Sequence, residues 1–142
     1  MRACILGCQG QRLTAEERAF FRDVRPWGFI LFGRNVGSLD QVRALTDELR
    51  DAVGDEAALV FTDQEGGRVQ RLKPPLARLR PPAARFGELY RRDPQAGLEA
   101  VFLSHRLMAW ELSAAGVDAD CVPCLDLRHP ETHAVIGDRS FA

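Results

Sequence analysis

Three cycles of a short apolar segment followed by a helical pattern constrain this chain more than any other feature. The apolar segments lie at residues 3–8, 28–33 and 58–61, and a fourth runs from Val117 to Leu127. Continuous apolar runs of this length are typical of strands covered on both faces, as in parallel sheets. Helices between such strands act as right-handed crossovers. The sequence therefore predicts an α/β fold with four parallel strands.

Helix-start signals stand between these segments. T-A-E-E at 14–17 and S-L-D-Q at 38–41 both match a capping box, in which the first and last side chains bond each other's backbone. Asp93-Pro94 places an N-cap before a proline at the first helical position. We expect helices over about 14–24, 38–54 and 93–116.

Two further patterns concern packing. The last of these helices carries an apolar stripe that we expect to face the core: Leu98, Val101, Phe102, His105, Met108 and Leu112. Residues 73–85 contain Pro74-Pro75 and Pro81-Pro82, which cannot lie inside a helix or a central strand. This segment is predicted to be an irregular surface excursion beside the end of the third strand.

Composition and charge exclude several classes of protein. The 19 Lys and Arg residues against 20 Asp and Glu leave no basic excess for binding nucleic acid. A hydrophobic content of 46% argues against disorder, and no apolar stretch approaches the ~18 residues of a membrane span. The apolar N-terminus is shorter than the roughly 7–15 residues of a secretory signal core. We therefore expect one cytoplasmic domain that binds neither nucleic acid nor membrane.

The cysteines and histidines do not form a convincing metal site. Cys121 and Cys124 have the C-x-x-C spacing, but on a strand residues i and i+3 point to opposite faces. Cys4 and Cys8 would lie about 13 Å apart at strand rise. His129 and His133 flank a proline-containing loop, where solvated side chains are the simpler interpretation. We expect buried thiols and no metal.

Polar side chains gather after the third apolar segment, in the string D-Q-E-G-G-R-V-Q-R at 63–71. In parallel α/β folds the functional groups lie at the carboxyl ends of strands, which places Asp63 at the rim of a pocket. Arg68 and Arg71 supply planar donors near the carboxylates, and Gly66-Gly67 permits a sharp turn or close approach of a ligand. The residues suit either a polyhydroxylated ligand or a structural network that caps the strand ends.

Four segments together resemble glycoside hydrolase family 3, and most closely its bacterial β-N-acetylglucosaminidases of cell-wall recycling. They are G-F-I-L-F at 28–32, the 63–71 string, P-C-L-D-L at 123–127 and I-G-D-R-S-F at 136–141. They occur in the family's order, and the resemblance runs from about residue 3 to the last residue. Periodicity alone leaves open whether the sheet is doubly wound or part of a (β/α)8 barrel. The resemblance implies the barrel.

The resemblance implies that residues 1–142 are the N-terminal half of a (β/α)8 TIM barrel domain, with four of its eight strands. It implies a β-N-acetylhexosaminidase that releases non-reducing terminal β-linked N-acetylglucosamine from muropeptides in peptidoglycan recycling, with retention of anomeric configuration. Asp63 would hold sugar hydroxyls, and Arg71 and Arg139 would contact the substrate. The family requires no metal and no organic cofactor.

The resemblance places the catalytic pair elsewhere. In this branch the acid/base histidine stands in a K-H-x-P-G-H-G segment after I-G-x-R-S, and the aspartate nucleophile follows later. Neither segment occurs in residues 1–142. We therefore expect both segments downstream of Ala142, and no catalytic residue within residues 1–142. Asp63 and Asp126 form an alternative carboxyl pair for retaining hydrolysis, which needs ~5–5.5 Å between the groups. The resemblance instead assigns Asp63 to substrate binding.

Two other hypotheses remain at this point. The chain is either a non-catalytic sugar-binding or regulatory half-barrel module, or an unrelated doubly wound domain in which the 63–71 string is coincidental. An isolated half-barrel would leave two open strand edges and is expected to self-associate.

Overall fold

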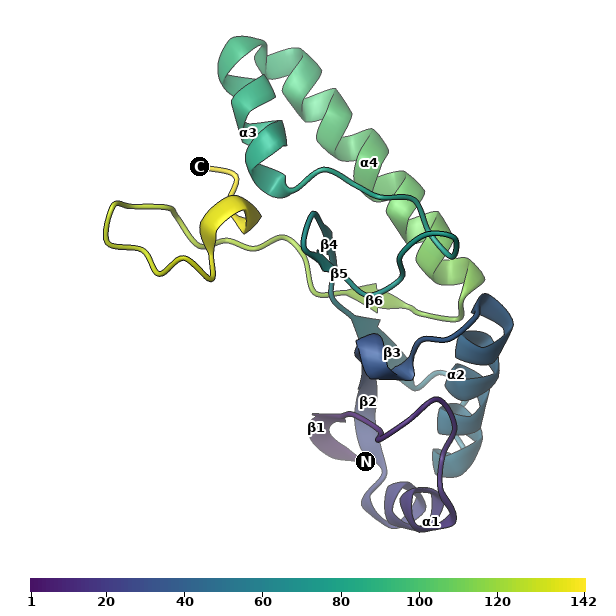
Figure 1. The fold of residues 1–142 in the computed structure, drawn as a ribbon. Coiled ribbons are helices and arrows are strands. Elements are labelled where there is room, and N and C mark those ends of the chain that lie inside the picture. The colour runs from purple at the N-terminus through teal and green to yellow at the C-terminus, as the bar shows by residue number, and fades with distance from the viewer.

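A four-stranded parallel sheet is the centre of the computed structural model, which describes residues 1–142 (Figure 1). Its strands are β1 (Arg2–Leu6), β2 (Pro26–Leu31), β3 (Leu59–Thr62) and β6 (Ala119–Asp120), in the spatial order β1-β2-β3-β6. Each strand pairs in parallel with the one before it in this order. The predicted α/β class with four parallel strands is confirmed.

The helices between the strands begin where the capping signals predict. Helix α1 (Ala15–Val24) has the full capping box, because Thr14 Oγ1 accepts from the Glu17 backbone and Glu17 Oε2 accepts from the Thr14 backbone. Helix α2 (Leu39–Val53) has half of one: Ser38 Oγ accepts from the Gln41 backbone, but the Gln41 side chain bonds Gly37 instead. Helix α4 (Pro94–Ala114) is capped by Asp93.

Helix α3 (Ala83–Arg92) was not predicted. It begins directly after Pro81-Pro82, so the irregular excursion ends at Pro82 rather than at residue 85. Prolines are compatible with the residues just before and at the start of a helix, and the sequence interpretation treated this pair only as a helix breaker. Helices α3 and α4 pack side by side as a hairpin that extends beyond the sheet (Figure 1).

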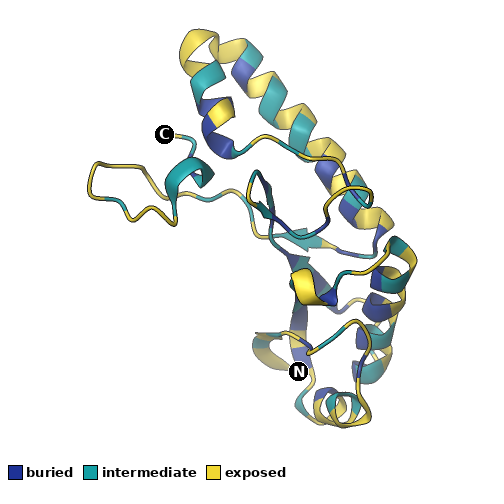
Figure 2. Ribbon diagram, in the orientation of Figure 1, coloured by how far each residue is buried: buried dark blue, intermediate teal, exposed yellow.

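The hydrophobic core lies between the sheet and the helices α1 and α2, and it extends to the C-terminal end of α4 (Figure 2). Phe29 of β2 is fully buried and meets Phe21 of α1 edge to face, with ring centroids 5.1 Å apart. Val60 and Thr62 of β3 are also fully buried, whereas the alternate residues Leu59 and Phe61 are only half-buried. The opposite face of the sheet is therefore only partly covered.

The predicted inner stripe of α4 is wrong for most of its length. Only Met108 and Leu112 are buried, while Leu98 and Phe102 are 60% and 62% exposed. His105 is half-buried and bonds the Val101 carbonyl through Nδ1. The reason is tertiary: α4 reaches the sheet only near its C-terminal end, and its first half lies beside α3 (Figure 2).

The fourth strand is much shorter than predicted. Strand β6 pairs with β3 only through Ala119 and Asp120, and residues 121–136 form no helix or strand before the short 3-10 helix η2 (Gly137–Arg139). The Cys121 backbone N–H donates to the Thr62 carbonyl, but Pro123, two residues later, has no N–H with which to extend the ladder. Asp126 therefore does not stand at a strand end, and Cys121 is exposed rather than buried.

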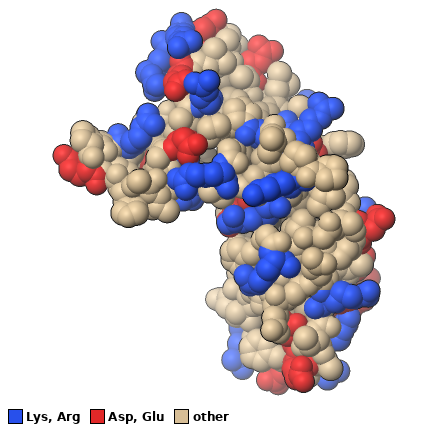
Figure 3. Space-filling view, viewed as in Figure 1, with Lys and Arg blue, Asp and Glu red and all other residues tan.

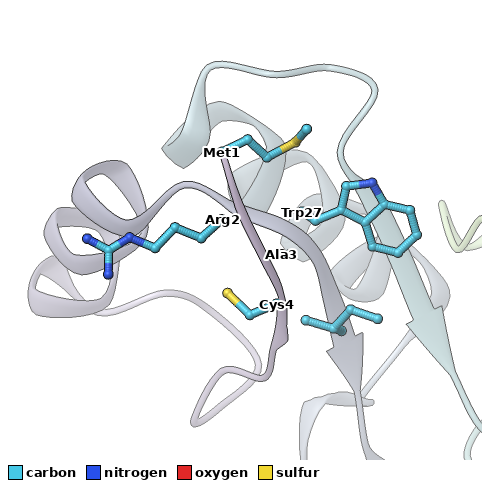
Figure 4. Close-up of a pocket in the computed structure, with 6 residues that line it drawn as sticks. Met1, Arg2, Ala3, Cys4 and Trp27 are labelled. Atoms are coloured by element: carbon cyan, nitrogen blue, oxygen red, sulfur yellow. The ribbon is translucent and has the colours of Figure 1, made fainter.

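The edge strand β1 leaves apolar surface open. A hollow of about 570 Å³ there is lined by Met1, Arg2, Ala3, Cys4, Ile5 and Trp27. Figure 4 shows Trp27 on one side of β1 and Arg2 pointing to the other. Trp27 and Ile5 are 43% and 41% exposed. None of the helices combines the length and the apolar character that crossing a membrane requires.

Candidate functional site

A two-stranded antiparallel ribbon, β4 (Gln64–Gly66) and β5 (Val69–Gln70), continues the chain beyond the carboxyl end of β3. Gly66 and Gly67 form its turn with φ of +91° and +56°, a region that side chains other than glycine rarely adopt. A Cβ on Gly66 would lie 2.5 Å from the Pro81 carbonyl oxygen. The glycine pair therefore makes a tight turn packed against Pro81-Pro82, not an opening for a ligand.

Two buried glutamines fasten this ribbon to the chain that follows it. Gln64 Oε1 accepts from the backbone of Arg71 and Leu72, and its amide donates to the Leu72 carbonyl. Gln70 donates to the carbonyls of Leu72 and Arg78. Sequence reasoning did not single out either residue, because a glutamine has no periodic or motif signature of burial. Their amides hold Arg71 in place at the rim.

Asp63 and Arg71, both predicted site residues, are in direct contact. Arg71 Nη2 lies 2.6 Å from Asp63 Oδ2, and the side chains remain 27% and 22% exposed. This is the single hydrogen bond of the Arg71 guanidinium, and its buried Nε has no partner. The pair is therefore preorganised by a short charge-assisted bond and keeps donors and acceptors available for a ligand.

Arg139, the third predicted residue, arrives from η2 and joins the ribbon through Glu65. Its Nη2 and Nε lie 2.6 and 2.8 Å from the two Glu65 carboxylate oxygens, a bidentate pair. This hydrogen bonding with Glu65 raises the pKa of Arg139 above its already high usual value. Glu65 was not predicted as a partner, because the two residues lie 74 positions apart in the chain.

Arg68 holds the segment before η2 rather than lining the rim. Its Nε donates to Asp138 Oδ1 at 3.1 Å, and its Nη2 donates to the carbonyls of Ala134, Val135 and Ile136. One guanidinium thus ties the ribbon to three successive carbonyls of a segment without regular structure. This connection places Arg139 beside Glu65.

Asp120, at the end of β6, is a further residue of the site that sequence reasoning missed. Its Oδ1 accepts from the Gln64 backbone at 2.8 Å, which joins the ends of β3 and β6. Burial raises the pKa of Asp120 to about 6, a rise that the neighbouring carboxylates of Asp63 and Glu65 reinforce and the Gln64 hydrogen bond opposes. The sequence predicts that the fourth strand continues past Asp120, whereas in the structure the strand ends there.

The substitution Asp120→Asn is expected to change how stability depends on pH. Because the folded-state pKa is raised from 3.8 to about 6, this group contributes stability below pH ~4 that is lost as pH rises through about 6. Thermal unfolding of the full gene product should show Tm of the variant rising relative to wild type between pH 4 and 7, by about 2–4 °C after discounting for partial exposure. Asp51→Asn, on an exposed position of α2, is the control. A Tm difference that does not change with pH contradicts the prediction.

The remaining candidates form no hydrogen bond or ion pair with this cluster. Asp126 bonds Cys124 Sγ, and His133 accepts from the Val135 backbone, both within the segment that lacks regular structure. His129 and His133 are exposed. The structure therefore brings together Asp63 and Arg71 directly, and Arg139 through Glu65, and does not add Asp126 or a histidine to them.

Parallel β/α units with half-buried carboxylate–arginine pairs beyond a strand end define an α/β protein whose polar side chains gather at the carboxyl edge of the sheet, where such folds place their functional groups. Comparison with known proteins narrows this class. Residues 5–142 match the family model described as the N-terminal domain of glycosyl hydrolase family 3. The chain belongs to glycoside hydrolase family 3, which removes the hypothesis of an unrelated doubly wound domain.

Individual relatives support this family assignment. A beta-hexosaminidase of Thioalkalivibrio sulfidiphilus is 45% identical over 96% of this chain, which covers 39% of that protein. The structure of NagZ from Neisseria gonorrhoeae in complex with zinc ion superposes with a TM-score of 0.88 at 35% identity, over 98% of this chain and 41% of that one. NagZ in complex with N-trifluoroacetyl-D-glucosamine superposes with a TM-score of 0.86 at 37% identity, over 96% of this chain and 39% of that one. The chain thus spans about two fifths of these relatives, and its sheet matches the barrel-like N-terminal part of NagZ.

Proposed function

We propose that the full gene product carrying this chain is a β-N-acetylhexosaminidase that hydrolyses non-reducing terminal β-linked N-acetylglucosamine with retention of configuration. The observation that carries the proposal is the Asp63–Arg71 pair, which stands at the end of β3 with donors and acceptors still available. Family membership and the beta-hexosaminidase relatives support the reaction class. The complex of NagZ with a glucosamine derivative supports the sugar.

In this proposal the three rim residues hold the terminal sugar. The Asp63 carboxylate accepts hydrogen bonds from ring hydroxyls, and Arg71 donates to a neighbouring oxygen. Arg139 donates to a further oxygen, and Glu65 orients its guanidinium. Hydrogen bonds to charged groups contribute about 1.5–3 kcal/mol each, so a few of them position a sugar ring firmly. No residue within 1–142 is given the catalytic acid/base or nucleophile role, and no cofactor is required.

The proposal extends to the biological substrate. Muropeptide fragments that carry terminal N-acetylglucosamine are the substrate we infer, and peptidoglycan recycling in the cytoplasm is the setting. These points rest on resemblance to the cell-wall recycling branch of the family, carried by the 63–71 string and the I-G-D-R-S-F segment at 136–141.

Hydrolysis of a chromogenic β-N-acetylglucosaminide by the full gene product tests the proposal. We expect turnover with the β-anomer of N-acetylglucosamine as the first product, read by proton NMR before mutarotation. The matching β-glucoside, which lacks the acetamido group, should be a poor substrate. Binding without turnover would favour the non-catalytic sugar-binding module, and an α-anomer as the first product would refute retention.

A further inference from the structure

Arg34 lies at the carboxyl edge of the sheet and takes no part in the site described above. It lies in the 3-10 helix η1 (Gly33–Asn35), which follows β2 directly, just as the Asp63 ribbon follows β3. Arg68, Arg71 and Arg139 each form an ion pair with a carboxylate, whereas Arg34 forms none and is exposed. In Figure 3, basic side chains run down the middle of this face with little acidic surface between them.

The guanidinium of Arg34 is nevertheless held in a defined orientation. Its Nε donates to the Cys8 carbonyl at 3.0 Å, and its Cζ lies 4.8 Å from the centroid of the Phe32 ring. A Cβ on Gly7 would lie 3.2 Å from Nη2, so the absence of a side chain there leaves room for the group. A main-chain acceptor, an aromatic ring and a glycine therefore form a cradle for this cation.

The base of the cradle is rigid. Asn35 is fully buried, and its amide donates to the carbonyls of Cys8 and Gly10 at 3.2 and 2.7 Å. Its Oδ1 accepts from the Phe32 backbone at 2.9 Å. These bonds tie the end of β1 to the end of β2, so Arg34 needs little reorganisation to bind a ligand.

The cradle adjoins the sugar-holding pair. Arg71 Cζ lies 6.0 Å from the centroid of the same Phe32 ring, and Asp63 neutralises the charge of Arg71. Arg34 thus adds a positive charge without a carboxylate partner beside a strand-end cluster that is otherwise made of matched pairs. Neither Nη atom of Arg34 donates a hydrogen bond within the protein, since only Nε does. A guanidinium with free N–H groups binds a carboxylate in a planar, bidentate arrangement.

We propose that Arg34 binds a carboxylate carried by the group attached to the terminal N-acetylglucosamine, and so selects acidic over neutral aglycones. This inference rests on the proposed function. The carboxylate either belongs to the sugar next to the scissile bond or to a peptide linked to that sugar. Both sources present the same planar anion to Arg34.

The test compares matched substrates on the full gene product. The first is a β-N-acetylglucosaminyl disaccharide whose second sugar carries a carboxylic acid, the second is its methyl ester, and the third has the acid amide-linked to a short acidic peptide. We expect wild type to favour the acid over the ester by about tenfold in kcat/KM, and Arg34→Gln to reduce that ratio to near one. Arg34→Lys should retain part of the preference, and added salt should weaken it in wild type.

Arg22→Gln is the matched control, because Arg22 is an exposed arginine in the last turn of α1 with no ion pair. It should leave all kinetic constants unchanged. A lost preference for the acid disaccharide identifies the sugar carboxylate as the ligand, and a loss confined to the peptide substrate identifies the peptide carboxylate. If Arg34→Gln keeps the wild-type ratios, or lowers acid and ester equally, the inference is wrong and Arg34 only supports the local fold.

Failure of the proposed function is distinguishable from failure of this inference. If wild type hydrolyses neither the chromogenic β-N-acetylglucosaminide nor any of the three substrates, the hexosaminidase assignment fails. Calorimetric titration of the acid and its ester then tests Arg34 directly, since the expected tenfold ratio applies equally to Kd. Equal Kd values for acid and ester in wild type would overturn the inference.

Discussion

Replacing Asp63 with alanine is expected to lower kcat/KM of the full gene product for a chromogenic β-N-acetylglucosaminide by about 100-fold or more. The change removes the carboxylate that accepts sugar hydroxyls in the proposed site. It also leaves Arg71 without its partner at 2.6 Å. A 100-fold loss corresponds to about 2.7 kcal/mol, which one or two hydrogen bonds to a charged group supply.

Three comparisons make this result specific. Asp63→Asn keeps the shape of the side chain but loses its charge, and should fall between alanine and wild type. Asp51→Ala, at an exposed position of α2, should behave as wild type. Thermal unfolding separates a binding defect from a folding defect. Unchanged steady-state kinetics in Asp63→Ala, measured on a folded protein, would remove Asp63 from the substrate site.

A polypeptide of residues 1–142 produced alone is expected to self-associate. In the described sheet β1 pairs only with β2, and β6 only with β3, so both edges present unpaired backbone groups. Exposed apolar side chains add to this. Trp27 lies beside β1 (Figure 4), Ile5 lies in β1 itself, and Phe102 and Trp110 lie on α4, with Trp110 72% exposed. Exposed apolar surface next to an open edge is a strong drive to association.

Light scattering after size exclusion measures the outcome, with chemical unfolding as a second readout. We expect oligomers or aggregate in aqueous buffer, and apolar-dye binding above that of compact globular proteins. A monomer that unfolds in one cooperative step would contradict the prediction and strengthen the alternative of a short sugar-binding module. Calorimetric titration of that monomer with N-acetylglucosamine would then show whether the rim binds sugar without the rest of a barrel.

Local signals account for what was predicted well. The starts of α1 and α4 follow from Thr14 and Asp93, because a capping side chain bonds backbone groups two or three residues away. Gly54 ends α2 with φ of +64°, again a property of one residue and its neighbours. The direct contact of Asp63 with Arg71 was also accessible, since both belong to one string of nine residues.

Long-range contacts account for what was missed. Asp120 belongs to the site because it bonds Gln64 across 56 positions, and Glu65 does so because it meets Arg139 across 74. Arg68 appeared to be a rim donor, but its partners lie 66 to 70 residues away. The same holds for α4, whose apolar stripe matched a helix facing the core although the hairpin with α3 carries half of it beyond the sheet.

The order of the four sheet strands and of helices α1, α2 and α4, and the placement of polar residues after β3, were determined by the sequence alone, because each depends on patterns within a few neighbouring residues. The family resemblance was also determined by the sequence, because each of its four segments is a short local string. The tertiary structure decided which charges pair, where β6 stops and that Arg34 stays free at the rim. Those outcomes depend on how segments far apart in the chain meet, and neither period nor motif encodes the distance between two side chains.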